Sequence, residues 1–228
     1  MPSSLIAVTY EAREPERAAR FWAALLALRP ADDTQLGLRF VPGRDGALGH
    51  NRIHLHLTSS DLDDQQRTVA RALELGARPL DVGQRPEEGH VVLADPAGYE
   101  FDVIEPGNAY LAGTGFLGEL ACDGTRAVGL FWAEALGWPL VWDSDEETAI
   151  QSPRGGTKVA WGGPPVAPNE QPNRQRFVLT AVGADQRTEV ERLIALGATR
   201  LGDGADGTVD LADPDGNQFS LAAATPCT

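Results

Sequence analysis

Stretches with strand and with helix periodicity alternate along the chain. Residues 5–10 are apolar and β-branched, as in a buried strand. Residues 15–28 begin with Pro15 and then place apolar side chains on one stripe, which predicts an amphipathic helix. The alternation indicates the α+β class. We expect helices at residues 15–28, 62–75, 125–136 and 186–196, and strands at residues 5–10, 36–41, 53–58, 91–93, 100–104, 116–122, 140–142, 148–151, 158–161, 177–182, 208–211 and 218–222.

The same pattern occurs twice. Residues 20–26 (RFWAALL) return as residues 130–136 (LFWAEAL), and residues 93–101 (LADPAGYEF) return as residues 211–219 (LADPDGNQF). Between them, the Leu-Gly-Ala segment at residues 75–77 returns at residues 196–198. Because the order of the segments is kept, the chain is a tandem duplication of a unit about 110 residues long.

The duplication sets the expected domain boundaries. We place one domain at residues 1–107, a linker at residues 108–115 and a second domain at residues 116–228. Each domain contains two smaller units that begin with a strand and a helix and continue into further strands. The linker contains Gly113 and Gly115, as expected of a connection between domains.

The two copies differ in length. The stretch from Phe21 to Gly76 is shorter than its counterpart from Phe131 to Gly197, although both begin and end at repeated motifs. The first copy has therefore lost about one strand and its turn, or the second copy has gained them.

These motifs resemble those of the vicinal oxygen chelate superfamily, which includes glyoxalase I, bleomycin-resistance proteins, fosfomycin-resistance enzymes and extradiol dioxygenases. The resemblance rests on the Phe-Trp helix, the Leu-Gly-Ala helix end and the Asp-Pro-x-Gly turn. It is closest to the glyoxalase-like subgroup, through residues 51–57 (NRIHLHL) and the turn at residues 95–98. It implies two tandem domains, each built from paired βαβββ units that form a curled mixed sheet, or cup, with helices outside.

The resemblance also implies positions for a metal site. Metal-dependent members place His on the first strand of a unit and Glu or His on its last strand, where a divalent ion acts as a Lewis acid. In the first domain these positions fall on Ala7, which cannot bind metal, and on His54 and Asp102, which can. A site for Zn, Ni, Mn or Fe would use His54 and Asp102, although absence of a cofactor is the main expectation. In the second domain the positions fall on Leu117, around Arg176 and on Ser220.

His54 and His56 are two positions apart on an expected strand, so both side chains should lie on one face. Asp102 and Glu100 should share the same cup from the last strand. Two interpretations stay open for His54, His56 and Asp102. They are metal ligands or an acid–base group, or they line a polar pocket without chemistry.

The second domain offers a different set of candidates. Trp142 and Trp161 fall on strands and could line the second cup, where they would stack on a planar ligand, or fill the core. Glu119 and Arg176 could face that cup, or pair with each other. By contrast, the tryptophans of the two Phe-Trp helices, Trp22 and Trp132, are expected to pack between helix and sheet.

Composition restricts the partners and the compartment. The formal charge of −14 and the absence of a basic cluster argue against nucleic-acid binding and against anionic membranes. No apolar run approaches the roughly 18 residues of a membrane span. The chain starts without a basic leader, and Cys122 and Cys227 cannot form a disulfide framework, so we expect a cytoplasmic protein. One lysine, Lys158, against 18 arginines indicates a GC-rich coding sequence, and we expect a bacterial protein.

The main hypothesis is therefore a glyoxalase-like protein that binds a small oxygenated or planar metabolite in a sheet-lined cup without the family's standard metal site. One alternative is a metal-dependent lyase, isomerase or dioxygenase that uses His54 and Asp102. Another is a resistance protein that sequesters an antibiotic. Enzyme status stays open, and the protein is expected to be a monomer or a homodimer.

Overall fold

The computed structural model describes residues 3–29, 36–46, 51–85, 87–166, 169, 172–204 and 207–223, and it contains every expected helix and strand. The helices are α1 (Pro15–Leu26), α2 (Leu62–Leu75), α3 (Arg126–Leu136) and α4 (Gln186–Ala195). The strands are β1 (Ser4–Ala12), β2 (Gly37–Pro42), β3 (Ile53–Leu57), β4 (Arg78–Pro79), β5 (Val91–Ala94), β6 (Glu100–Val103), β7 (Leu117–Cys122), β8 (Leu140–Ser144), β9 (Glu147–Gln151), β10 (Lys158–Trp161), β11 (Gln175–Thr180), β12 (Thr199–Asp203), β13 (Val209–Ala212) and β14 (Gln218–Leu221).

Local capping explains where α2 begins and ends. The side chain of Asp61 accepts a hydrogen bond from the backbone N–H of Asp64 at 2.7 Å, which satisfies one of the free N–H groups at the helix start. Gly76 ends the helix in the left-handed conformation, with φ of 107°, where glycine has no Cβ penalty.

Within the described part of the chain, no helix has the length and hydropathy needed to cross a membrane.

The strands form two mixed sheets. Sheet I has the order β12-β13-β14-β11-β1-β2, and sheet II has the order β4-β5-β6-β3-β7-β10-β9-β8. At the centre of each sheet, the first strands of two units pair antiparallel. These are β1 and β11 in sheet I, and β3 and β7 in sheet II. The α+β class, the tandem units and the mixed sheets are therefore confirmed.

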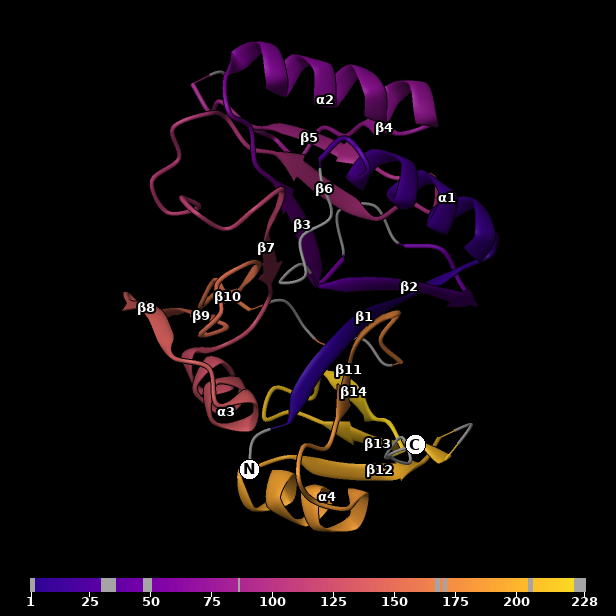
Figure 1. The fold of residues 1–228 in the computed structure, drawn as a ribbon, viewed down its shortest axis with the longest axis vertical. Coiled ribbons are helices and arrows are strands. Elements are labelled where there is room, and N and C mark those ends of the chain that lie inside the picture. The colour runs from indigo at the N-terminus through magenta and orange to yellow at the C-terminus, as the bar shows by residue number, and fades with distance from the viewer. Residues whose placement is uncertain are drawn as a thin grey trace.

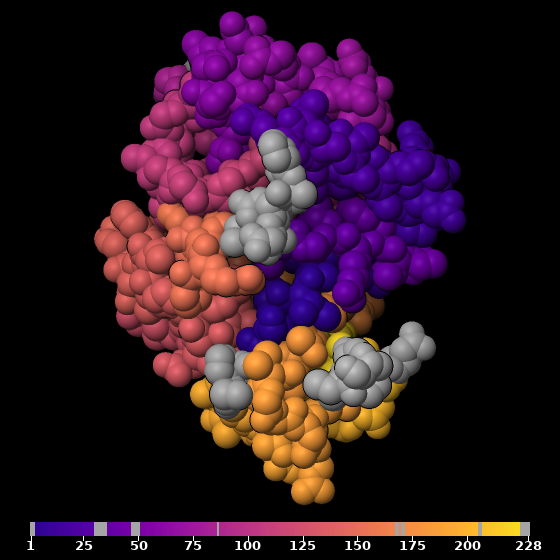
Figure 2. All heavy atoms as spheres, in the orientation of Figure 1, coloured from indigo at the N-terminus to yellow at the C-terminus, as the bar shows by residue number. Residues whose placement is uncertain are grey.

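Each sheet combines strands from both copies. Sheet I joins the first unit of the first copy to the last unit of the second copy, and sheet II joins the two units in between. In Figure 1 the N-terminal strand β1 lies beside β11, which follows it by more than half the chain. Figure 2 shows the result on the surface, where N-terminal residues (indigo) lie against the C-terminal part (orange). The domain boundaries at residues 107 and 116 stay a prediction about the repeats, and the sheets do not follow them.

The difference in length between the copies corresponds to two strands within the described residues. After α3 come β8, β9 and β10, whereas after α1 only β2 is described. β2 pairs parallel with β1 as β10 pairs parallel with β7, so β2 is the counterpart of β10. The strands without a described counterpart are therefore β8 and β9, and β2 lies at the edge of sheet I.

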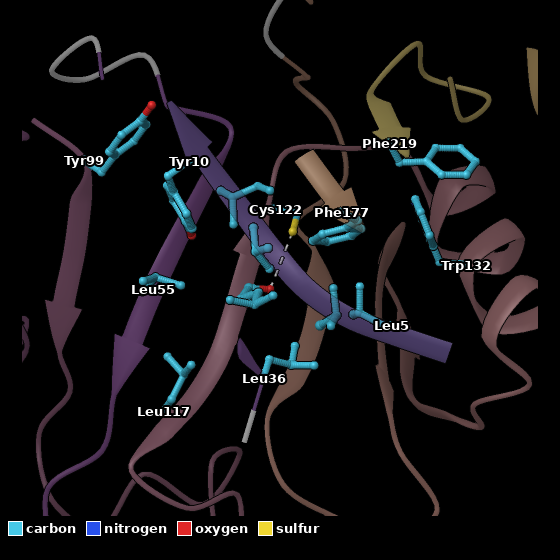
Figure 3. Packing of buried hydrophobic residues seen from close by; sticks show 14 of the residues in the cluster. Leu5, Tyr10, Leu36, Leu55, Tyr99, Leu117, Cys122, Trp132, Phe177 and Phe219 are labelled. Carbon is cyan, nitrogen blue, oxygen red and sulfur yellow. Dashed lines mark hydrogen bonds between the residues drawn. The ribbon is translucent and has the colours of Figure 1, made fainter. Parts of the chain in front are cut away.

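The two sheets share one hydrophobic core, which includes the Phe and Trp side chains of the two Phe-Trp helices. Trp22 of α1 packs edge-on against Phe101 of sheet II, with the ring centres 5.0 Å apart. Trp132 of α3 packs at 5.0 Å against both Phe177 and Phe219 of sheet I, as Figure 3 shows. Both tryptophans are buried, which confirms that they are packing residues.

Each of these tryptophans also donates a buried hydrogen bond to the aspartate of the repeated turn. The indole Nε1 of Trp22 lies 2.8 Å from Asp95 Oδ2, and that of Trp132 lies 3.1 Å from Asp213 Oδ2. The other oxygen of Asp95 accepts the backbone N–H groups of Ala97 and Tyr99 at 2.8 and 2.9 Å. The turn chemistry expected for Asp95 and Asp213 is therefore present, and it also ties each turn to a helix.

Replacing Asp95 by asparagine should destabilise the protein. Asp95→Asn turns the amide nitrogen toward the indole N–H, which leaves one buried donor without an acceptor, or toward the two backbone N–H groups, which leaves two. We expect the free energy of unfolding to fall by about 1–3 kcal/mol in urea denaturation. The exposed Glu134→Gln should change it by less than about 0.5 kcal/mol, and equal losses in the two variants would contradict the role of Asp95.

Candidate functional site

The face of sheet II opposite the helices carries the candidate residues, and it is called the cup face below. On β3, Leu55 and Leu57 belong to the hydrophobic core. Because side chains alternate along a strand, His54 and His56 lie on the cup face, as the sequence predicts. The same alternation on β6 places Phe101 in the core and Asp102 on the cup face.

Four charged side chains form one row across four neighbouring strands of the cup face. His56 of β3 is in register with Asp102 of β6 on one side and with Glu119 of β7 on the other. Glu119 is in register with Lys158 of β10. The row therefore runs Asp102, His56, Glu119, Lys158, and the paired side chains project side by side from the sheet.

His56 lies between two buried carboxylates. Its Nδ1 is 2.7 Å from Glu119 Oε2, and its Nε2 is 3.2 Å from Asp102 Oδ2. Burial alone would lower the pKa of His56, but hydrogen bonds to Asp102 and Glu119, together with their charges, outweigh it and raise the pKa from 6.5 to about 9. His56 is therefore an imidazolium at neutral pH, with both ring nitrogens donating.

One carboxylate oxygen of Asp102 has no hydrogen-bond partner within the described part of the chain. The residue is only 8% exposed, and this oxygen, Oδ1, is buried. A buried acceptor without a donor costs free energy, about 1–3 kcal/mol in typical cases. A ligand that brings a donor to this oxygen recovers that cost.

The linker covers the other end of the row. Tyr110, within the predicted linker, donates from its hydroxyl to Glu119 Oε1 at 2.7 Å. Lys158 donates to the backbone carbonyl of Tyr110 and its Nζ lies 4.2 Å above the centre of the Tyr110 ring. Trp142 packs edge-on against the same ring, with centres 6.1 Å apart. Glu119 therefore has both oxygens engaged, whereas Asp102 Oδ1 has no hydrogen-bond partner among the described residues.

His54 lies beside the row and contacts different groups. Its Nε2 is 2.7 Å from the backbone carbonyl of Asn51 and 3.8 Å from Glu100 Oε2. Burial raises the pKa of Glu100; the charge of His54 opposes this rise and that of Asp102 adds to it. The structure thus pairs His54 with Glu100 and His56 with Asp102.

The donor set does not fit the divalent ion that the metal-dependent relatives imply. A zinc-type site takes at least three protein donors. The carboxylates of Asp102 and Glu119 contact opposite nitrogens of the His56 ring, so an ion on Nε2 has Asp102 beside it but not Glu119. Within the described residues, no group of three or more His, Cys, Asp or Glu is arranged to hold a metal. The expectation that no cofactor is bound stays a prediction.

The candidates of the second copy lie in different places. Of the two interpretations left open for Trp161, the structure supports core packing, because Trp161 is 2% exposed and the alternation of β10 places it on the helix side. Glu119 and Arg176 do not share a cup, since Glu119 is on β7 in sheet II and Arg176 is on β11 in sheet I. Trp142, by contrast, is 45% exposed and lies next to Tyr110. Whether Trp142, Glu119 or Arg176 binds a ligand stays a prediction.

Sequence reasoning missed Lys158 and Tyr110 as members of the site. Lys158 is the one lysine of the chain and falls on an expected strand, so its rarity and its position already distinguish it. Tyr110 had no such signal, because a linker residue is brought to the cup by tertiary contacts alone.

The two cysteines are not among the residues of the row. Cys122 is a buried free thiol, and Cys227 lies outside the described residues.

Comparisons with known proteins agree with this arrangement of units. A family model described as a glyoxalase-like domain matches residues 7–104 and again residues 119–222. Glyoxalase I from Zea mays is similar over 97% of this chain and 92% of its own length, at 14% identity and a TM-score of 0.65. A protein of Bacillus subtilis named as a candidate dioxygenase is similar over 98% of this chain and 86% of its own, at 14% identity and a TM-score of 0.57. No curated protein matches the chain. At these identities the structural likenesses show the fold alone.

The charge of His56 should be measurable directly. Because the pKa is raised from 6.5 to about 9, the ion pairs of His56 stabilise the fold fully below about pH 6.5, and this stabilisation is lost as the pH rises through 9. We expect an NMR titration of the imidazole to give a midpoint near 9 and Asp102→Asn to lower it. Glu134→Gln is the control, and a wild-type midpoint at or below 6.5 would contradict the charged row.

Proposed function

The chain belongs to the glyoxalase-like domain family of the vicinal oxygen chelate superfamily, and we propose that it binds a small oxygenated metabolite on the cup face of sheet II. In this proposal His56 transfers a proton to the bound metabolite. The observation that carries the proposal is the row of Asp102, His56, Glu119 and Lys158. In this row a partly buried imidazolium lies beside a carboxylate that has one oxygen without a partner among the described residues.

The two nitrogens of His56 have different roles in the proposal. The shorter contact, 2.7 Å from Nδ1 to Glu119, fixes the ring, and Glu119 is itself held by the Tyr110 hydroxyl. The longer contact, 3.2 Å from Nε2 to Asp102, is the one that a ligand oxygen can replace. Nε2 is therefore the proton donor, Asp102 Oδ1 accepts a ligand hydroxyl, and Glu119 is a positioning residue.

The row also favours a particular class of ligand. A compound with neighbouring hydroxyl and carbonyl oxygens can donate to Asp102 Oδ1 and accept from His56 Nε2 at once. His56 then polarises the carbonyl and donates its Nε2 proton to the carbonyl oxygen, while the proton of the adjacent C–H is lost to solvent water, which gives the enol. After proton transfer the neutral imidazole remains hydrogen-bonded to Glu119. No cofactor takes part in this proposal, and the metal-dependent alternative lacks a convergent pair, because His54 faces Glu100 rather than Asp102.

The proposal is tested with hydroxyacetone and dihydroxyacetone as probes. In D2O the protein should accelerate exchange of the hydrogens beside the carbonyl, which one-dimensional NMR follows. His56→Gln should reduce the rate about 10²-fold or more, the low end of acid–base contributions. Asp102→Asn should weaken probe binding, whereas Glu100→Gln, on the same strand and face, should keep most of the activity. Exchange that His56→Gln leaves unchanged would refute the role of His56.

A second candidate function, capture of a planar molecule such as an antibiotic, is favoured by one observation. Trp142 is 45% exposed and lies edge-on to Tyr110, so an aromatic face is open to solvent beside the row. A planar ligand that stacks there should quench tryptophan fluorescence without metal. Trp142→Ala should abolish the quenching, and Trp138→Ala, at a partly buried position outside the cup, is the control. Quenching that survives Trp142→Ala would place the ligand elsewhere.

A further inference from the structure

We propose that the cup face of sheet I binds a small oxyanion, a carboxylate or a phosphate group, between Arg39, Thr9 and Arg176. On β1, Val8 and Tyr10 belong to the core, so Thr9 projects from the face opposite the helices. Thr9 is in register with Arg39 of β2 on one side and with Arg176 of β11 on the other. The three side chains therefore form one row on the cup face, and Figure 1 shows the three strands next to one another.

The spacing of this row suits one oxyanion. Neighbouring strands are about 4.8 Å apart, so the two arginine Cα atoms lie roughly 10 Å apart on either side of the threonine hydroxyl. Arginine side chains are long enough to converge across that distance. Two guanidinium groups and a hydroxyl provide several N–H and O–H donors, which match the planar or tetrahedral oxygens of a carboxylate or phosphate.

The duplication shows that this row is the counterpart of the row in sheet II. Thr9 precedes Phe21 by the same interval by which Glu119 precedes Phe131, so the two residues occupy equivalent places in the repeat. β2 pairs with β1 as β10 pairs with β7, so Arg39 occupies the place of Lys158. Arg176, which pairs with Thr9, occupies the place of His56, which pairs with Glu119. Both rows therefore have a cationic side chain on either side of this position, and sheet I has the uncharged Thr9 where sheet II has the carboxylate of Glu119.

The arginines of sheet I are not neutralised within the described part of the protein. Arg176 donates from Nε to the backbone carbonyl of Asn173 at 3.0 Å, and among the described residues neither Arg176 nor Arg39 forms an ion pair. Arg174, two positions before Arg176, has a buried Nε without an acceptor among the same residues. In a chain with a formal charge of −14, arginines aligned on one face without carboxylate partners there indicate a negatively charged ligand.

The carboxylates on this face are held by other partners. Glu11, two positions after Thr9 on β1, accepts the backbone N–H of Arg44 at 3.3 Å. Asp210 of β13 accepts the Ser220 hydroxyl at 2.7 Å. Among the described residues no strand covers this edge, since the first copy has no described counterparts of β8 and β9, and Arg39 is exposed on the edge strand. A solute can therefore reach the row without displacing a described covering strand.

The test uses inorganic phosphate and succinate as probes for the two ligand classes. Isothermal titration at low ionic strength should give saturable binding of at least one of them, with sodium chloride at matched ionic strength giving none. Preference for phosphate or for succinate assigns the ligand class. Arg39→Gln and Arg176→Gln should each weaken binding about tenfold, the effect of losing one charge-assisted hydrogen bond.

Arg78→Gln is the matched control, since Arg78 is also exposed on the short edge strand β4, but in sheet II. It should leave binding unchanged. No saturable binding of either probe, or an equal loss in Arg78→Gln, would overturn the proposal. His56→Gln should not affect phosphate or succinate binding, so the outcome is independent of the function proposed for sheet II. Unchanged melting temperatures of the unliganded variants would show that the losses do not come from unfolding.

Discussion

The hydrogen bond from a helix-borne indole to a buried turn aspartate is the interaction on which the arrangement of the two sheets depends. Trp22 reaches from the helix after β1, a strand of sheet I, to the turn of Asp95 in sheet II. Trp132 makes the reverse connection, from the helix after β7 in sheet II to Asp213 in sheet I. Each of these hydrogen bonds therefore lies within one copy and links the two sheets, whereas the strand pairing within each sheet joins the two copies. Because both groups are buried, neither partner can be removed without leaving a polar atom unsatisfied.

The cross-copy pairing in turn creates the two rows of the cup faces. His56 comes from the first copy and Glu119 from the second, and they meet because β3 pairs with β7. Thr9 and Arg176 meet in the same way, because β1 pairs with β11. A site in this fold consequently takes residues from each copy, and its charge is set by two segments that lie far apart along the chain.

Much of this could be predicted from the sequence, and the failures have identifiable causes. Strand alternation predicts the shared face of His54 and His56, and the repeated motifs predict the units, because both depend on local spacing. Strand pairing between copies depends on tertiary contacts. The sequence therefore could not exclude that Glu119 and Arg176 share a cup, nor show that Tyr110 lies over Lys158. For Trp161 the sequence left cup lining and core packing open, since alternation allows either face of β10 to be buried and only tertiary packing selects one.

The exchange of strands between the copies has a consequence for symmetry. A single copy on its own contains half of each sheet, so two separate copies would have to associate to complete both, and the two cups would then be identical by the symmetry of the pair. Joining the copies through one linker removes that constraint, because a substitution in one copy is no longer repeated in the other. One cup was thus free to keep the carboxylate of Glu119 between two cationic side chains, while its twin has the uncharged Thr9 between two arginines.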